Sequence, residues 1–318
     1  MNADFEVELA HGARRPYRRT QSFAALNRRL SAQLLRLTAH GDALLVEEPW
    51  PEPLVTEARR RGVELASTRA RGSQSDKLFT PWGWTPTAAE AGVRACAEVR
   101  PLDLEVVARV NSKLWSHALE VEMGWALEGA CVARTPEELA AAAARACPGA
   151  QDKWVVKSPY GFAARDRVLG RGPRVEWAQG AWAARRFERG EALVFQPWLE
   201  VLREYGVVAE VMRDGSHRVH GVSDLQTNGA GTGTGYVLGR PPTAVRMKEL
   251  EGVAAVVCAR LHAEGYEGPV GIDALEHSGG LHPLLEVNAR YTMGFVALAV
   301  ERSMRPTEPT FWSTKAGD

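Results

Sequence analysis

The segment from Gly268 to Arg290 constrains the fold of this chain more than any other part of its sequence. Two apolar runs flank Ser278–Gly279–Gly280 there, a pattern that predicts a β-hairpin. If the two glycines form a two-residue turn, position 273 pairs with position 286. Asp273 and Glu286 then lie directly opposite each other, with their Cβ atoms ~5 Å apart.

Two carboxylates in that arrangement repel each other unless a positive group lies between them. Asn288 points to the same face as Glu286, because side chains alternate along a strand. Two carboxylates and one amide oxygen suit a hard cation such as Mg²⁺. The alternative interpretation is a solvent-facing hairpin with unrelated acids, since a register slip of one residue breaks the pairing.

Two further segments suit a nucleotide. Lys157 ends an apolar strand predicted over residues 153–157, and a loop of small residues at 158–165 follows it, so its charge and the loop N–H groups suit phosphates. The apolar strand at 193–200 offers backbone groups to a purine, and Glu204 close behind it offers a carboxylate to a ribose. Taken singly, a strand-end lysine is also typical of a solvated edge, and such a strand is typical of an ordinary core.

The order of these pieces along the chain carries more information than any one of them. It resembles the order found in the ATP-grasp superfamily over roughly residues 40 to 300, with Glu-Val-Asn-Ala-Arg as its most specific part. The matching segments are Asn111–Ser112–Lys113 at a helix start, Gly124, the helix-capping Thr135–Glu138, Val155–Lys157, Phe195–Leu199, Glu204–Tyr205, Gly271–Asp273 and Glu286–Arg290.

The resemblance implies a role for each matching residue that would contact ATP. Lys113 and Lys157 are expected to hold the phosphates, and Glu204 the ribose hydroxyls. The adenine is expected to meet the backbone of the segment containing Gln196, Trp198 and Leu199, with Leu199 as the N–H donor.

The resemblance also implies the metal and catalytic groups. Asp273, Glu286 and Asn288 are expected to bind Mg²⁺, with Mn²⁺ as an alternative ion, and Arg290 is expected to meet the transferring phosphate or the bound acid. The phosphate-covering loop of the family is usually glycine-rich, whereas here Phe162, Ala163, Ala164 and Arg165 follow Gly161. Gly161 and Arg165 are expected in the ATP site. Two interpretations of the departure are open: the loop is stiffer than in the family, or Arg165 supplies charge in place of backbone N–H groups.

The fold implied is ATP-grasp, α/β plus α+β. The expected units are an N-terminal α/β domain at 1–108, a small subdomain at 109–195 and a C-terminal subdomain with the metal site at 196–318, the last two clasping ATP. A strand at 42–46, a helix at 52–61 and a strand from residue 62 predict parallel pairing in the first unit. A helix is predicted over 22–37, whereas residues 1–20 and 303–318 are expected to be irregular.

The function implied is that of an ADP-forming ligase, which activates a carboxylate as an acyl phosphate for attack by an amine or another nucleophile, with carbon–nitrogen bond formation favoured. A small-molecule kinase needs the same metal site and remains an alternative. A nucleotide-binding regulator without turnover is a third class. The complete set of expected metal ligands, Asp273, Glu286 and Asn288, argues against it.

Composition limits the partners. Lys plus Arg and Asp plus Glu both number 39 in the 318 residues, which argues against a nucleic-acid or anionic-membrane binder acting through bulk charge. The four cysteines form no CxxC pair, so a zinc site or a disulfide framework is not expected. No signal peptide or spanning segment is evident, and a cytoplasmic protein with small-molecule substrates is expected. The sequence leaves oligomerisation open.

Two loops have no assigned role. The aromatic loop at 81–86 is interpreted as a Trp-capped turn or as a wall of the substrate pocket. The glycine- and threonine-rich segment 223–235 is interpreted as a mobile cover over the site or as a surface loop. Its GxGxG spacing lacks the following helix that dinucleotide binding requires.

Overall fold

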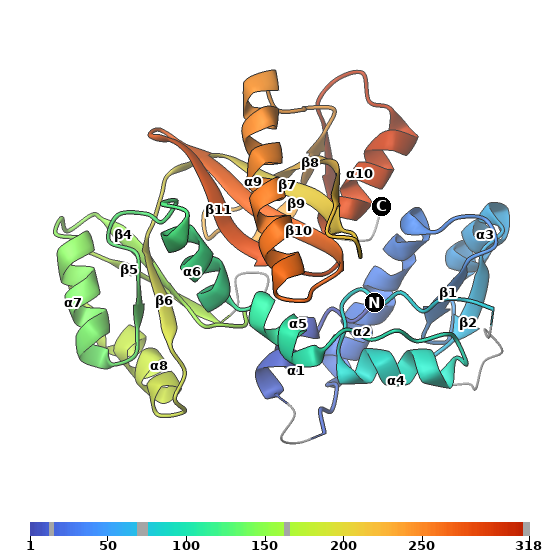
Figure 1. Cartoon of the computed structure of the whole chain (residues 1–318), viewed down its shortest axis with the longest axis horizontal. Helices are drawn as coiled ribbons and strands as arrows, with labels where there is room; N and C mark the ends of the chain where they lie inside the picture. The colour runs from blue at the N-terminus through green and yellow to red at the C-terminus, as the bar shows by residue number, and fades with distance from the viewer. Residues whose placement is uncertain (13–15, 69–75, 162–165, 314–318) are drawn as a thin grey trace.

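The computed structural model of the chain describes residues 1–12, 16–68, 76–161 and 166–313. Within these ranges the strands form sheets of two, four and six strands, and the six-stranded sheet lies between the other two in the view of Figure 1. The loop residues 162–165, including Arg165, lie outside the described residues. No helix within the described ranges is both long enough and apolar enough to cross a membrane.

The first sheet belongs to the N-terminal part of the chain. β1 (Ala43–Val46) and β2 (Glu64–Ser67) pair in parallel across α3 (Glu52–Arg61), which confirms the predicted strand–helix–strand unit. The predicted helix at 22–37 consists of α2 (Gln21–Ser31) followed by the 3₁₀ helix η1 (Ala32–Leu37). α4 (Pro86–Arg94) completes this part.

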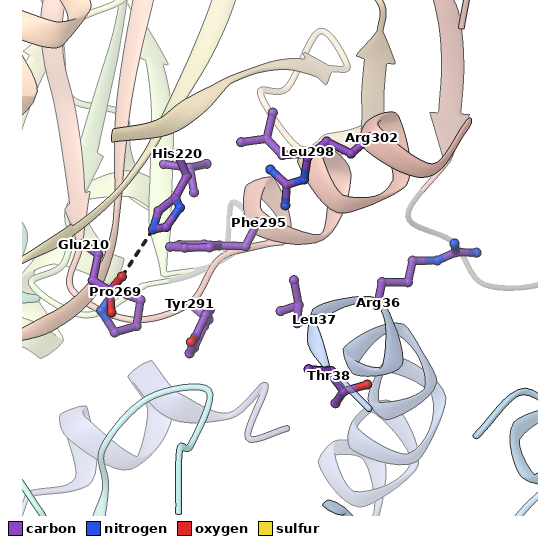
Figure 2. A pocket seen from close by; sticks show the side chains of 12 residues that line it. Arg36, Leu37, Thr38, Glu210, His220, Pro269, Tyr291, Phe295, Leu298 and Arg302 are labelled. Atoms are coloured by element: carbon purple, nitrogen blue, oxygen red, sulfur yellow. Dashed lines mark hydrogen bonds and ion pairs between the residues drawn. The ribbon is translucent and has the colours of Figure 1, made fainter. Parts of the chain in front are cut away.

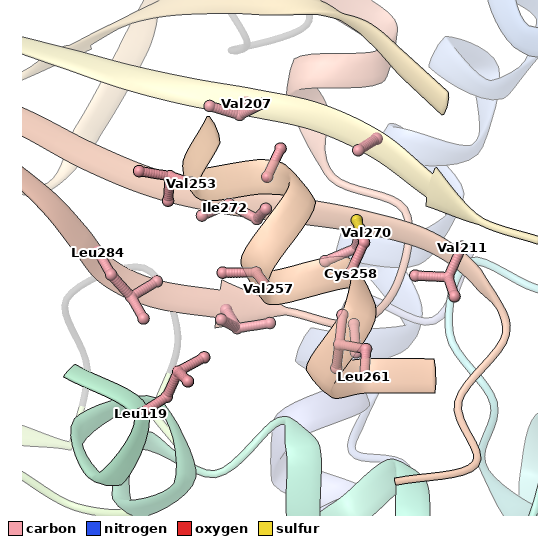
Figure 3. Close-up of a cluster of buried hydrophobic side chains, with 14 of the residues drawn as sticks. Leu119, Val207, Val211, Val253, Val257, Cys258, Leu261, Val270, Ile272 and Leu284 are labelled. Carbon is pink, nitrogen blue, oxygen red and sulfur yellow. The ribbon is translucent and has the colours of Figure 1, made fainter. Parts of the chain in front are cut away.

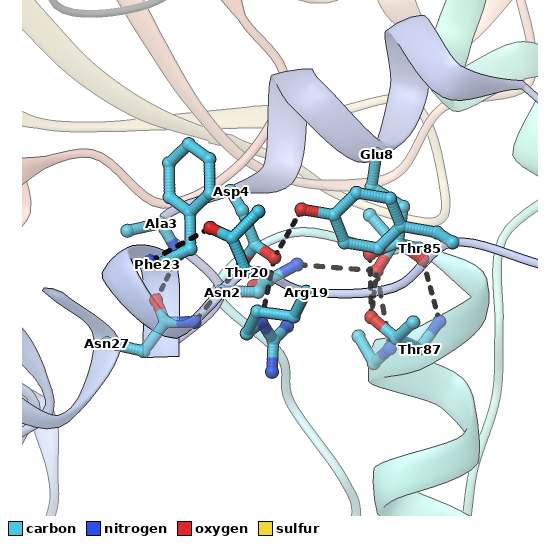
Figure 4. A network of polar contacts seen from close by, with 12 residues as sticks. Asn2, Ala3, Asp4, Glu8, Arg19, Thr20, Phe23, Asn27, Thr85 and Thr87 are labelled. Carbon is cyan, nitrogen blue, oxygen red and sulfur yellow. Dashed lines mark hydrogen bonds and ion pairs between the residues drawn. The ribbon is translucent and has the colours of Figure 1, made fainter. Parts of the chain in front are cut away.

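The expectation that residues 1–20 are irregular was wrong, because α1 (Phe5–His11) forms there. The acidic side chains of Asp4 and Glu8, at the start of this helix and within it, bond to residues that no local sequence pattern identifies. Asp4 is fully buried and accepts hydrogen bonds from Tyr17 at 2.9 Å, Arg19 at 2.7 Å and Asn27 at 3.2 Å (Figure 4). Together with the bonds from Thr87 to Glu8, these contacts attach the N-terminal helix firmly to its surroundings.

The four-stranded sheet is antiparallel, with strand order β3-β6-β4-β5. α7 starts as predicted, because the Thr135 side chain caps it by accepting from the Glu138 N–H at 3.2 Å. The apolar core of this sheet centres on Trp154, Leu193 and Phe195, which are fully buried. The elements of this part are α5 (Leu104–Val110), α6 (Lys113–Glu122), β3 (Cys131–Ala133), α7 (Pro136–Ala146), β4 (Lys153–Lys157), β5 (Arg167–Arg171), α8 (Trp177–Phe187) and β6 (Leu193–Pro197).

The six-stranded sheet is antiparallel, with strand order β11-β10-β7-β8-β9-β12. Helix α9 packs its buried residues, such as Val257 and Leu261, against Val207 of β7 and Ile272 of β10, and Leu119 of α6 joins this cluster (Figure 3). The elements of this part are β7 (Val201–Val211), β8 (His217–Thr227), β9 (Gly233–Leu238), α9 (Ala244–Ala263), β10 (Gly268–His277), β11 (Gly280–Asn288), α10 (Met293–Met304) and β12 (Thr310–Ser313).

Two loop assignments need correction. Most of the segment 223–235 belongs to strands β8 and β9, and only residues 228–232 connect them. The expected C-terminal tail contains β12, which pairs with β9 along residues 310–313. The extent of β8 and β9 and the whole of β12 were misassigned, because these residues lack a clear apolar–polar alternation.

The hairpin pairing between Asp273 and Glu286 is confirmed, although the predicted turn was wrong. His277 pairs with Gly280, so the turn residues are 278 and 279 rather than 279 and 280. A β-bulge between the pairs 275–282 and 273–286 then restores the register, because three residues of β11 lie opposite one residue of β10. The extra residues include Pro283, which has no N–H to donate to the ladder.

The close approach of the aromatic loop to α1 predicts that Gly83 cannot be enlarged without cost. A Cβ at this position would lie 2.5 Å from the buried ring of Phe5 and 3.2 Å from the Cβ of Arg290. We expect Gly83→Ala to lower the free energy of unfolding by about 1–3 kcal/mol in urea denaturation. Gly252→Ala in α9 is the control, because its Cβ would meet no atom within 4 Å and alanine favours the helix. Equal stability of Gly83→Ala and the wild type would contradict the packing described.

Candidate functional site

Strand alternation brings the predicted acids to one face of the six-stranded sheet. Ile272 and Val287 point into the core under α9, so their neighbours Asp273 and Glu286 point to the opposite face. Glu204 of β7 shares that face, because Asp273 pairs with Gly206 and Glu204 lies two residues away. The three carboxylates thus come from three adjacent strands.

The pair of opposing carboxylates is only partly compensated. The ammonium group of Lys113 lies 2.7 Å from Oε1 of Glu286, whereas Asp273 accepts a hydrogen bond from the Asn288 amide at 3.0 Å. Burial, reinforced by the negative charges of Glu286 and Glu204, raises the pKa of Asp273 to about 7.

This donor set fits a hard divalent cation. Asp273 and Glu286 offer carboxylate oxygens, and Asn288 offers an amide oxygen that also accepts from Arg290 at 2.9 Å. Asp273 is a buried acid with no ion pair to a cation among the described residues, although Arg290 acts on it electrostatically. Within the described ranges, no group of three or more His, Cys, Asp and Glu side chains is arranged to hold a metal ion. Mg²⁺ matches such a set because it usually takes one or two carboxylates and completes its shell with water and phosphate oxygens.

The two predicted phosphate lysines face the same region from the four-stranded sheet and α6. Lys113 is the first residue of α6 and also donates to the Gly161 carbonyl at 2.7 Å. Lys157 ends β4 and is buried, and its ammonium group donates to Oε1 of Gln196 at 2.7 Å. Burial lowers the pKa of Lys157 to about 8, and Lys113 adds to this effect, whereas Glu286 opposes it. These couplings place the lysines beside the acids.

The backbone of β11 is held on its outer edge by side chains that the sequence reasoning assigned no such role. Ser116 of α6 accepts the Val287 N–H at 3.1 Å. Asn111 accepts the Ala289 N–H at 2.9 Å and donates to the Ala289 carbonyl at 3.4 Å. The Asn-Ser-Lys run therefore supports the strand as well as supplying Lys113, and its position just before a helix start is the only signal in the sequence.

The expected adenine and ribose residues lie between the two sheets. Gln196 is buried, its side chain bonds to Lys157, and its backbone pairs with Val155 of β4. The Trp198 N–H donates to the Lys153 carbonyl at 2.8 Å, and Leu199 follows in the connection to β7. Glu204 accepts from the Thr227 hydroxyl at 2.6 Å, and burial raises its pKa.

Arg167 is a cation that the sequence reasoning missed. It begins β5, two residues beyond Arg165, and its guanidinium group lies 5.7 Å from the centre of the Trp198 ring. It also donates to the Ala230 carbonyl in the β8–β9 connection. Burial lowers its pKa, while Glu204 and Glu286 act in the opposite direction. The 228–232 connection therefore meets the four-stranded sheet beside the predicted site.

Arg290 is engaged by the N-terminal helix. Its Nε donates to Oε1 of Glu6 at 2.8 Å, and its Nη2 donates to Oδ1 of Asn288 at 2.9 Å. The Phe5 ring centre lies 5.6 Å from the guanidinium carbon. An acid from the first helix thus reaches the arginine that ends the hairpin motif.

A separate cavity of about 280 Å³ lies between η1, β7, β8 and α10 (Figure 2). Leu37, Phe295 and Leu298 give it an apolar wall, and His220 and Glu210 lie 3.3 Å apart at one side. None of the predicted site residues lines it, so it is distinct from the candidate site.

The raised pKa of Asp273 predicts a pH-dependent cost to the apo protein. A carboxyl whose folded pKa of about 7 lies above its usual value near 4 destabilises the folded state by an amount that grows as the pH rises from about 4 to about 7 and levels off above 7. Asp273→Asn removes this cost. We expect its gain in unfolding free energy over the wild type to grow by on the order of 1 kcal/mol between pH 6 and pH 8.

Urea denaturation in EDTA without nucleotide measures that gain. The exposed Glu251→Gln serves as the control and should show the same difference from the wild type at both pH values. A pH-independent gain for Asp273→Asn would show that the carboxylate is not perturbed.

The sequence matches no protein-family model and no curated protein. The structure, in contrast, is similar to that of several solved enzymes. D-alanyl-alanine synthetase A from Vibrio cholerae O1 biovar eltor str. N16961 matches with a TM-score of 0.54 and 13% identity, over 85% of this chain and 95% of that chain.

Two further structures show the same likeness. N5-carboxyaminoimidazole ribonucleotide synthetase from Thermus thermophilus has a TM-score of 0.52 and 16% identity, over 83% of this chain and 70% of its own. The biotin carboxylase domain of Hydrogenobacter thermophilus 2-oxoglutarate carboxylase, solved with MgADP, ADP and bicarbonate, has a TM-score of 0.55 and 13% identity, over 90% and 68%. All three are ATP-grasp enzymes, and this chain therefore has the ATP-grasp fold.

Proposed function

We propose that this protein is an ATP-dependent, Mg²⁺-requiring ligase. It activates a carboxylate as an acyl phosphate, which an amine or another nucleophile then attacks, with release of ADP and phosphate. One observation carries the proposal. Asp273 and Glu286 lie opposite each other on the hairpin, Lys113 forms an ion pair with Glu286, and Lys157 lies within electrostatic range of the same carboxylate. The solved structures of similar fold are synthetases and a carboxylase domain, one of them bound to MgADP and bicarbonate.

The chemistry is limited by charge. A carboxylate and a γ-phosphate are both anions, so they approach each other only where cations offset their repulsion. Lys113, Lys157 and Arg167 are the described cations that face this region from the four-stranded sheet and α6. Mg²⁺, held by Asp273, Glu286 and Asn288, would neutralise charge on the phosphates.

The remaining residues would orient the substrates. The backbone from Gln196 to Leu199 would bind the adenine and Glu204 the ribose. Arg290 would bind the acid or the transferring phosphate, which would replace Glu6 as its partner. A carboxylate oxygen attacks the γ-phosphorus as the bond to the ADP oxygen breaks, and the nucleophile then displaces phosphate from the acyl carbon. The protein forms no covalent bond in this scheme.

The three units predicted from the sequence, at 1–108, 109–195 and 196–318, remain part of the proposal, with ATP clasped between the last two. A cytoplasmic location and small-molecule substrates are likewise proposed. These assignments are consistent with the likeness to enzymes that act on small molecules.

The lowered pKa of Lys157 predicts how nucleotide affinity depends on pH. Only the protonated amine attracts phosphate, so the affinity for Mg-ATP should fall as the pH rises from 8 to 9.5. Lys157→Ala should bind Mg-ATP about 10- to 150-fold more weakly at pH 7.5 and lose most of this pH dependence. Lys248→Ala, on the exposed side of α9, should behave like the wild type in the same calorimetric titrations. Wild-type affinity for Mg-ATP in Lys157→Ala would remove this lysine from the site.

Incubation with Mg-ATP and pools of carboxylic acids, with and without amines, tests the proposed reaction. ADP formed only when acid and amine are both present identifies a ligase. A stable phosphorylated alcohol identifies a kinase, and binding without turnover in any pool identifies a regulator. Glu286→Gln should lower the rate of ADP formation by orders of magnitude. ADP formation that survives unchanged in this variant would exclude the hairpin acids from the reaction.

A further inference from the structure

A buried polar cluster contacts Lys157 on the side of Gln196. It contains His117 and Glu120 of α6, Gln196 of β6 and His282 of β11, with exposed fractions of 4%, 1%, 3% and 2%. No pattern in the sequence predicts that these residues meet, because three different elements contribute them. The cluster lies where α6, the four-stranded sheet and the edge of the six-stranded sheet meet.

The contacts form a chain that leads to the lysine. Lys157 donates to Oε1 of Gln196 at 2.7 Å, and Nε2 of Gln196 donates to Oε2 of Glu120 at 3.3 Å. The same carboxylate oxygen lies 3.0 Å from Nδ1 of His117. Both ends of the Gln196 amide are therefore occupied.

The second oxygen of Glu120 faces the other imidazole. Its Oε1 lies 3.0 Å from Nε2 of His282, but the two groups are not aligned for a hydrogen bond, and neither atom has a hydrogen-bond partner within the described residues. A buried carboxylate is costly without nearby partners, and Glu120 has the two imidazoles beside it and the Lys157 ammonium within electrostatic range.

Electrostatics gives the amide of Gln196 one preferred orientation. In the reversed orientation its NH₂ group would face the ammonium of Lys157 and its oxygen would face the carboxylate of Glu120. Both contacts would be repulsive in a buried site, where unfavourable polar contacts cost most. Lys157 and Glu120 thus favour the same orientation of the amide, with its oxygen toward the lysine.

We propose that Glu120 is a positioning residue, which fixes the Gln196 amide and, through it, holds the Lys157 ammonium in the place where it meets the ATP phosphates. The inference rests on the proposed function, since it assigns Lys157 to the nucleotide. His117 contacts one oxygen of the Glu120 carboxylate, and the His282 ring lies beside the other. One helix, α6, then carries both Lys113 and the residue that orients Lys157.

The role predicts a defect confined to the phosphate end of the ligand. Glu120→Met keeps the side-chain length but removes the acceptor, and we expect it to weaken Mg-ATP binding about 5- to 30-fold by calorimetry while adenosine binding stays within 2-fold of the wild type. Glu120→Gln retains one acceptor oxygen and should restore most of the affinity. Glu122→Gln, on the exposed face of the same helix, should have no effect.

A double-mutant cycle separates positioning from general damage. If Glu120 acts through Lys157, then Glu120→Met should change Mg-ATP affinity by less than 2-fold in the Lys157→Ala background. Equal losses in both backgrounds, or a parallel loss of adenosine binding, would overturn the inference. Gln196→Met provides the same test if Glu120→Met does not fold, because it removes the connecting amide.

The same measurements distinguish this inference from the proposed function. If Lys157→Ala weakens Mg-ATP binding but neither Glu120→Met nor Gln196→Met does so, the positioning role fails and the proposed function stands. If Lys157→Ala leaves the affinity unchanged, the lysine is not a phosphate ligand, and the positioning role falls together with the role of Lys157 in the proposed function.

Discussion

The candidate site depends on how the edge of the six-stranded sheet is held. β11 is an edge strand, so its outward backbone groups need partners from elsewhere in the molecule. Ser116 and Asn111 supply them at Val287 and Ala289, and Lys113 binds Glu286 from the start of the same helix. Because side chains alternate along the strand, holding the backbone at 287 and 289 also sets the directions of Glu286 and Asn288.

Burial then determines the charge states of the site. Desolvation and two neighbouring carboxylates raise the pKa of Asp273, which favours its neutral form. Desolvation and the charge of Lys113 lower the pKa of Lys157, which favours the neutral form of the lysine. Each perturbed group is one that a bound partner of opposite charge would restore to its charged form. In the proposed function a divalent cation would do this for the acids and polyphosphate would do it for the lysines, so the same arrangement would favour binding of both together.

Helix α6 and the N-terminal helix connect this site to the rest of the molecule. α6 carries Lys113 at its start, Ser116 beside β11 and Glu120 in the buried cluster, and therefore couples the four-stranded sheet to the β10–β11 hairpin. The N-terminal helix reaches the other end of the hairpin, where Glu6 binds Arg290 and Phe5 packs beneath it. The aromatic loop leaves room for that packing only because residue 83 is glycine.

The sequence by itself determined the features that depend on neighbours along the chain. The capped helix at Pro136–Ala146, the parallel pair around α3 and the pairing of Asp273 with Glu286 follow from local capping, periodicity and turn signals. The turn, however, lies one residue earlier than predicted, at 278–279. Asp273 still pairs with Glu286 because a bulge that includes Pro283 restores the register. The tertiary structure alone decided the partners of Arg290, the cation at Arg167, and the cluster that joins Lys157 to Glu120. The physical reason is that these contacts join side chains from elements distant in sequence, such as Glu6 and Arg290, and no local periodicity records which buried charges will meet.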